Sequence, residues 1–294
     1  MLPRAVISGH FIIMKETILV VGGPESGKTT ALVQVAIDNP DMPFFAFDTE
    51  YNIERVCSFF GGVPANLTIL DAITIQEMRA AMEKQVIPAF ASTPLGYGGV
   101  LIDMVENVWE RAQNEMASLK GVDTGTLAAN SNNPLTGGFE SGDWGPIKKW
   151  YFDIVQYALI KLRCNVFMTA GQKEIIEDKG QLGRASYLAH DPRLVEIWKD
   201  YGYIPAGEKS LSYNVSTALG LEASGLIRKT FKLTLAKDRA RSMRATKKFK
   251  REILKPSEVR FEGTEDETEV YNIWRSLSQL RPDFVYPFAS GSQG

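Results

Sequence analysis

The sequence predicts an α/β fold: a mostly parallel β-sheet with flanking helices and a C-terminal antiparallel hairpin. Short apolar runs alternate with helical patterns over the first two thirds of the chain, and such runs are typical of parallel strands buried on both faces. From residue 215 the hydrophobic period changes to two, which indicates antiparallel strands. With 294 residues, 44% of them hydrophobic, the chain is long enough to bury a large core.

The first predicted unit is a strand, a glycine-rich loop and a helix. Residues 17–30 read TILVVGGPESGKTT and match the spacing G-x-x-x-x-G-K-[ST] between an apolar run and a helical pattern. Glycines let such a loop turn tightly and present backbone N–H groups to phosphate oxygens at the positive end of a helix. We expect the loop to bind a nucleoside triphosphate; the alternative is a glycine turn beside a surface lysine. The expected binding residues are Gly22, Gly23, Pro24, Glu25, Ser26, Gly27, Lys28, Thr29 and Thr30.

Two side chains of this loop have a chemistry of their own. Lys28 is expected to reach the β- and γ-phosphates with its ammonium group, and Thr29 to hold Mg²⁺ through its hydroxyl. The sequence therefore predicts ATP and Mg²⁺ as cofactors.

The next part of the chain continues the alternation of strands and helices. We expect strands over 43–47, 67–70 and 100–103, and helices over 53–60, 74–90 and 105–119. Phosphoryl transfer also needs a carboxylate near Mg²⁺ and a group that orients the attacking water. Asp103 ends a strand and fits the first role, with a helix cap as the alternative. In many ring ATPases the catalytic glutamate directly follows this aspartate, but here that position is Met104. We therefore expect the water-orienting group elsewhere, with Glu50 as our candidate and Glu106 as the second choice.

The second half of the chain begins with residues 121–145, which are rich in Gly, Asn, Ser and Thr and predict a long flexible loop. A helix over 146–162 and a strand over 166–169 follow, and this strand leads to the polar residue Gln172. Residues 181–209 have no clean period.

A hairpin with one face in water is expected from Val215 to Leu235, with its turn at 223–225 and Thr234 on the wet face. The tail carries a predicted helix over 265–280. The predicted organisation is an N-terminal extension (1–14), an ATPase core (15–255), and a C-terminal helix and tail (256–294). Met14 is a possible alternative start that keeps the whole motif.

Taken together, these motifs resemble those of the RecA-like recombinase ATPases. The strand end at residues 47–50 is similar to their F-[IL]-D-x-E, whose glutamate activates water, and residues 101–103 are similar to their Walker B. The resemblance implies that Gln172 is a sensor of the γ-phosphate. It also implies that Lys237 and Arg239 reach the nucleotide of a neighbouring subunit, in a head-to-tail ring or filament. Among these ATPases the chain most resembles the short phage-encoded ones that act in recombination and single-strand annealing.

Charge is distributed unevenly along the chain. The net charge is −2, but residues 228–255 contain twelve Lys or Arg and two acids, so this segment carries +10 and the remainder −12. We expect Lys247, Lys248, Lys250 and Arg251 to contact DNA phosphates, in a binding that weakens with salt. The alternative is a solvated face. In relatives the loops that correspond to 121–145 and 174–210 also contact DNA.

The two cysteines, Cys57 and Cys164, are not in a C-x-x-C pair, and the two histidines are far apart, so no disulfide framework or zinc site is predicted. No signal peptide or membrane-spanning apolar run is evident, and we expect a soluble protein of the cytoplasm, or of a host's cytoplasm if it is viral.

The function predicted from these residues is ATP hydrolysis coupled to binding of single-stranded DNA in recombination, repair or replication. A packaging or helicase-type motor is one alternative, although few residues remain after 255 for a nuclease domain. A KaiC-like nucleotide-switched regulator without DNA is another. A small-molecule kinase fits least, because no arginine-rich lid is visible.

Overall fold

A computed structural model describes residues 15–121, 139–175, 194, 197–198, 201–224, 230–239 and 259–262. The main sheet consists of β1 (Thr17–Gly22), β2 (Phe44–Asp48), β3 (Leu67–Leu70), β4 (Gly99–Asp103), β5 (Asn165–Ala170), β8 (Thr217–Ser224), β9 (Thr230–Asp238) and β10 (Val259–Glu262). Its strand order is β10-β9-β8-β1-β5-β4-β2-β3. Strands β8 to β3 of this order pair in parallel, whereas β9 pairs antiparallel with both β8 and β10. The predicted α/β arrangement, a mostly parallel sheet with a C-terminal antiparallel hairpin, is confirmed.

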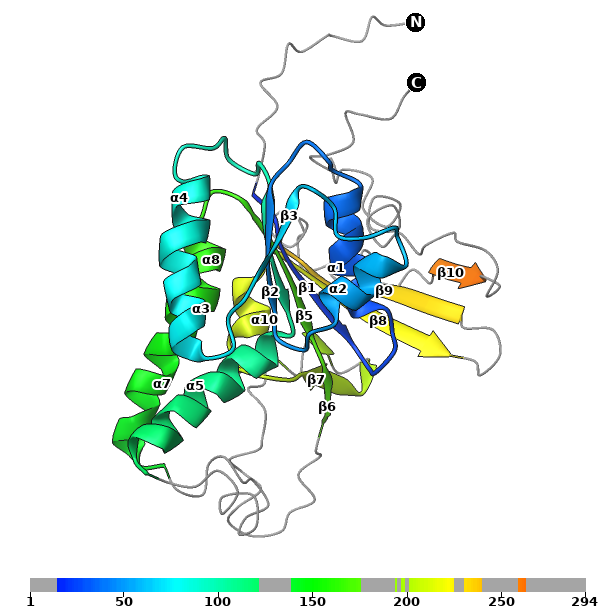
Figure 1. Cartoon of the computed structure of the whole chain (residues 1–294). Helices are drawn as coiled ribbons and strands as arrows, with labels where there is room; N and C mark the ends of the chain where they lie inside the picture. Colours follow the sequence, from blue (N-terminus) through cyan, green and yellow to red (C-terminus); the bar gives the residue numbers. More distant parts are fainter. Residues whose placement is uncertain are drawn as a thin grey trace, which may run out of the picture.

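Helices cover both faces of the sheet (Figure 1). One face packs against α1 (Lys28–Ile37) and α2 (Ile53–Ser58); the other packs against α3 (Ile75–Ala81), α4 (Ile87–Phe90), α5 (Val105–Leu119), α7 (Trp144–Tyr151) and α8 (Tyr157–Ile160). In β1, Ile18 and Val20 face the α1 side and Leu19 and Val21 face the α5 side, all fully buried. This two-sided burial explains the continuous apolar runs in the sequence.

The predicted helix over 74–90 is present as α3, a π-helical turn (Met82–Val86) and α4. It starts with a capping box: the Thr74 hydroxyl accepts the Glu77 N–H at 3.2 Å, and Glu77 Oε2 accepts the Thr74 N–H at 2.8 Å. Pro88 has no N–H to donate, so the regular hydrogen-bond pattern is interrupted at this point, directly after the π-helical turn.

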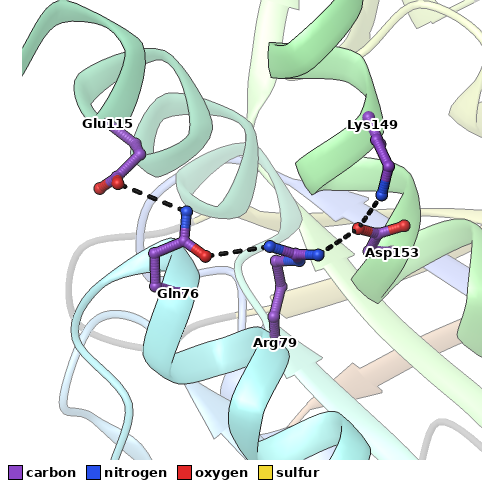
Figure 2. A network of polar contacts seen from close by, with 5 residues as sticks. All are labelled: Gln76, Arg79, Glu115, Lys149 and Asp153. Carbon is purple, nitrogen blue, oxygen red and sulfur yellow. Dashed lines mark hydrogen bonds and ion pairs between the residues drawn. The ribbon is translucent and has the colours of Figure 1, made fainter. Parts of the chain in front are cut away.

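A chain of polar contacts joins α3, α5 and the α7 side of this helical layer (Figure 2). Arg79 of α3 forms an ion pair with Asp153 at 2.8 Å, and Lys149 of α7 forms another with the same carboxylate at 2.9 Å. Gln76 accepts from Arg79 and donates to Glu115 of α5. Because these side chains are partly or fully exposed, each contact stabilises the fold by less than about 1 kcal/mol.

The C-terminal hairpin differs from its prediction in two ways. Strand β8 continues to Ser224, so the expected turn at 223–225 starts too early. Thr234, expected on a wet face, is 2% exposed, and the prediction of an open face is wrong at this position. The reason is that β8 is an interior strand between β1 and β9, and Tyr201 and Tyr203 lie over Gly220 on the face that was expected to be in water.

The predicted loop over 121–145 is also too long, because a 3₁₀ turn (Ser141–Asp143) and then α7 begin inside it. A separate two-stranded ribbon pairs β6 (Gln172–Glu174) with β7 (Tyr203–Pro205), and a short helix, α10 (Leu211–Asn214), precedes β8. The sequence did not predict β7, α10 or β10. The expected extension over 1–14 and the expected helix over 265–280 lie outside the described residues.

Cys57 and Cys164 are both free thiols, and both are buried. None of the helices in the described part of the chain combines the length and the apolar character that a membrane crossing requires.

Candidate nucleotide-binding site

The glycine-rich loop connects β1 to α1 at the carboxyl edge of the sheet. Gly27 precedes the helix with φ 86°, and Glu25 has φ 56°, a left-handed conformation that is uncommon outside glycine. A Cβ on Gly22 would lie 2.4 Å from both the Leu221 carbonyl oxygen and the Ser26 hydroxyl, so only glycine fits there. The loop therefore has the tight, strained shape that the motif requires.

Lys28 is the first residue of α1, directly after the loop, and is 8% exposed. Its ammonium donates to the carbonyl oxygens of Gly22 at 2.9 Å and of Gly23 at 2.7 Å. Burial lowers the pKa of Lys28, while the nearby carboxylates of Asp103, Glu106 and Glu50 act in the opposite direction. The cation is thus held by neutral backbone groups in the field of three acids.

Asp103 is fully buried at the end of β4 and binds two hydroxyl groups. Its Oδ2 accepts from Thr29 at 2.7 Å, and its Oδ1 accepts from Thr169 of β5. Burial raises the pKa of Asp103 to about 6, against the effect of these two hydrogen bonds. The structure thus places Asp103 within hydrogen-bond distance of Thr29, the other residue expected to bind Mg²⁺, and the metal-binding role of both stays a prediction. Thr169 was not assigned a role from the sequence, although it belongs to the strand that leads to Gln172.

Thr49 fixes the end of β2 beside the end of β4. Its hydroxyl donates to the Asp103 carbonyl at 2.7 Å and accepts the N–H of Met104 at 2.8 Å and the Asn107 amide at 3.0 Å. The Thr49 carbonyl accepts from Arg111 at 3.0 Å. These bonds hold the backbone directly before Glu50. The only signal for them in the sequence is the position of Thr49 at a strand end.

A cavity of about 1,110 Å³ lies over the loop, and all of the predicted nucleotide-binding residues except Gly23 line it. Gly23 lines a smaller adjoining cavity of about 370 Å³. Glu50 and Gln172 also line the larger cavity, as expected for groups that act on a bound nucleotide. Sequence reasoning missed several lining residues from α2 and from the β6–β7 ribbon: Asn52, Arg55, Val56, Phe59, Glu174 and Tyr203.

The two candidate bases have different surroundings. Glu50 is exposed on the cavity wall, where its only described hydrogen bond is a long one, 3.4 Å, from Asn52. Glu106 is 8% exposed, does not line the cavity, and accepts the Gly171 N–H at 2.6 Å. Burial raises the pKa of Glu106, and the Gly171 N–H and Lys28 counteract this. The geometry favours Glu50 for contact with water, and its role stays a prediction.

Gln172 follows β5 by two residues and is exposed at the first position of β6. Its Oε1 lies 3.3 Å from the position that a Cβ on Gly23 would take, so the amide is next to the glycine-rich loop. The structure therefore brings the proposed sensor to the loop.

The residues expected to act in a neighbouring subunit lie on and next to β9. The Lys237 ammonium donates to three carbonyl oxygens of its own chain, those of Ser212, Tyr213 and Val215, at 2.6, 3.0 and 2.9 Å. Burial lowers the pKa of Lys237 to about 8. Arg239 also donates to the Tyr213 carbonyl, at 2.9 Å. All three ammonium hydrogens of Lys237 are used within the chain, so a role in trans would require these bonds to break; for both residues this role stays a prediction.

The expected DNA-contacting residues Lys247, Lys248, Lys250 and Arg251 lie outside the described residues. Most of residues 121–145 and 174–210, the loops expected to contact DNA, also lies outside the described residues. The DNA contacts therefore remain expectations from the charge pattern and the resemblance.

Comparison with known proteins identifies no family for this chain. No model of a known protein family matches the chain, and no curated protein matches it. One similar solved structure is that of a KaiC-like protein from the hyperthermophilic archaeon Pyrococcus horikoshii, with a TM-score of 0.42, 11% identity and 84% of each chain covered. A likeness of this size says nothing about function, and the P-loop fold is assigned from the strand order and from the loop itself.

Proposed function

We propose that this protein binds ATP with Mg²⁺ and hydrolyses it. The observation that carries the proposal is the contact between the Thr29 hydroxyl and the buried Asp103 carboxylate, next to Lys28 at the base of the 1,110 Å³ cavity. A cation, a hydroxyl and a carboxylate at the end of a glycine-rich loop are the groups that phosphate and Mg²⁺ require.

The residues present fit both cofactors. Hydroxyl and carboxylate oxygens are hard ligands of the kind that Mg²⁺ prefers, and Thr29 and Asp103 supply one of each. The Lys28 ammonium, which now binds the Gly22 and Gly23 carbonyls, would exchange them for phosphate oxygens. Bound Mg²⁺ would neutralise charge on the phosphates.

In the hydrolytic step, Glu50 orients and polarises the attacking water, because its carboxylate is exposed to the cavity. Gln172, whose amide lies against Gly23, senses the terminal phosphate. An additional cation in trans increases turnover by about 10³ to 10⁵ in P-loop enzymes where such a group has been measured. An assembly in which Lys237 or Arg239 reaches a neighbour's site would therefore be much faster than an isolated subunit.

Coupling to single-stranded DNA, in a recombination, repair or replication process, is the finer part of the proposal. It is supported by the +10 charge of residues 228–255, in which Lys247, Lys248, Lys250 and Arg251 cluster around one aromatic residue, Phe249.

Steady-state kinetics test both ATP hydrolysis and its coupling to DNA. Hydrolysis is measured with and without a single-stranded oligonucleotide, at several protein concentrations and two salt concentrations. The proposal expects hydrolysis that DNA stimulates, with a stimulation that grows with protein concentration and decreases with salt. Hydrolysis indifferent to DNA would remove the DNA part and favour a nucleotide-switched regulator. No hydrolysis under any condition would contradict the enzyme itself.

A further inference from the structure

Glu106 is a buried carboxylate that the proposed hydrolytic step does not use. It lies in the first turn of α5, three residues after Asp103, and is 8% exposed. Its Oε1 accepts the backbone N–H of Gly171 at 2.6 Å, and its Oε2 is buried without a hydrogen-bond partner among the described residues. A buried carboxylate with one oxygen unpaired is costly, so a role is expected to compensate for it.

Gly171 is the single residue between β5 and β6, and both its N–H and its carbonyl form hydrogen bonds. Its N–H donates to Glu106, and its carbonyl accepts the Ala206 N–H at 2.9 Å. One bond comes from the helix that follows β4, and the other comes from the residue that follows β7. The Glu106 carboxylate thus binds the peptide group directly before Gln172, which is itself paired with Pro205 in the β6–β7 ribbon.

Two glycines make this close packing possible. A Cβ on Gly171 would lie 2.7 Å from Glu106 Oε1, and a Cβ on Gly207 would lie 3.2 Å from Glu106 Cα. Gly171 does not have a positive φ, so a larger residue there would be opposed by the carboxylate, which would have to move away, and not by the backbone conformation. The Glu106 side chain is fitted between the β5–β6 junction and the segment after β7.

We propose that Glu106 is a positioning residue that holds Gly171 and thereby keeps the Gln172 amide against the glycine-rich loop. This inference rests on the proposed ATPase function. In this role the carboxylate acts as a hydrogen-bond acceptor, and its charge is not required. Glu106 links the strand that ends at Asp103 to the β6–β7 ribbon, so it connects the metal-binding end of the site to the sensing end.

Glu106→Gln and Glu106→Ala separate this role from that of a catalytic base. Glutamine keeps a carbonyl oxygen for the Gly171 N–H, whereas alanine removes it. We expect Glu106→Ala to lower kcat by about tenfold to a hundredfold with little change in KM, because it removes the acceptor of the Gly171 N–H. Glu106→Gln is expected to stay within about threefold of wild type. Equal loss of turnover in both variants would overturn the proposal and identify Glu106 as a group whose charge is needed.

A double-mutant cycle with Gln172→Ala tests whether Glu106 acts through Gln172. If it does, the Glu106→Ala and Gln172→Ala losses are not additive, and the double variant hydrolyses ATP about as slowly as Gln172→Ala alone. Losses that multiply would contradict the coupling. Glu110→Ala, on an exposed position one turn along α5, is the matched control and is expected to leave kcat unchanged.

Hydrogen exchange of the backbone over 170–174 tests the positioning without any activity. Glu106→Ala is expected to accelerate exchange in this segment, while Glu106→Gln and Glu110→Ala leave it near wild type. This readout keeps two failures apart: a wild-type protein without ATPase activity contradicts the proposed function, whereas unchanged exchange in Glu106→Ala contradicts the positioning role.

Discussion

The hydroxyl of Thr29 donates a 2.7 Å hydrogen bond to the carboxylate of Asp103, across 74 positions of the sequence. The contact connects the first turn of α1 to the end of β4, although β5 lies between β1 and β4 in the sheet. Thr169 of that intervening strand completes the arrangement with a bond to the other carboxylate oxygen. The parallel order of the strands thus builds the proposed metal site from three separate segments.

Thr29→Val tests the hydroxyl as an Mg²⁺ ligand. The substitution keeps the shape and removes the oxygen, so Mg²⁺-dependent hydrolysis should fall at least about a hundredfold while binding of ATP in EDTA changes little. Titration of phosphate release with Mg²⁺ measures this. Thr68→Val, at an exposed position of β3, is the control and should behave as wild type. An unchanged Mg²⁺ response in Thr29→Val would remove Thr29 from the metal site.

Glu50→Gln tests the assignment of the water-orienting group. The amide cannot take a proton from water, so the variant should bind ATP normally and lose turnover by about 10²-fold or more. Fluorescent-nucleotide binding and phosphate release, measured on one preparation, separate the two effects. Glu54→Gln, an exposed residue of α2 that does not line the cavity, should be active. Full turnover in Glu50→Gln would transfer the role to another group.

Gly22→Ala tests the close packing of the loop. The added methyl group would meet the Leu221 carbonyl and the Ser26 hydroxyl at 2.4 Å, so we expect a loss of about 1–3 kcal/mol in the free energy of unfolding and weaker nucleotide binding. Gly142→Ala is the control, because no atom lies within 4 Å of its Cβ position. Denaturant unfolding of both variants gives the comparison, and equal stability would contradict the described loop geometry.

The burial of the Lys237 ammonium is expected to make the stability of the protein depend on pH. Its pKa is about 8 in the folded protein, below the ordinary value of 10.5, so between these values the unfolded chain binds more protons than the folded one. Stability relative to Lys237→Met should therefore increase as the pH rises through this window. Melting temperatures of both proteins at pH 7.5 and pH 9.5 measure this difference. A difference that stays constant would show that the ammonium is not desolvated.

The sequence was sufficient for the P-loop, for most of the parallel strands and for the position of Asp103 at the end of β4, because these depend on local patterns and on strand ends. It was not sufficient to predict the hydrogen bonds of Thr169 and Thr49 to Asp103, or the hydrogen bond from Gly171 to Glu106. These contacts depend on which strands become neighbours. The burial of Thr234 was missed for the same reason: period-two alternation indicates a strand but does not reveal that tyrosines cover its second face.

ATP hydrolysis at this cavity is tested most directly by comparing phosphate release from ATP by the wild type and by Lys28→Met. Binding of a fluorescent ATP analogue is followed in the same samples. Lys28 supplies the cation at the base of the cavity, and methionine has a similar length without the charge. We expect Mg²⁺-dependent hydrolysis by the wild type and a loss of both binding and turnover in the variant. A wild type that neither binds nor hydrolyses ATP, or a Lys28→Met variant with wild-type activity, would contradict the proposed ATPase function.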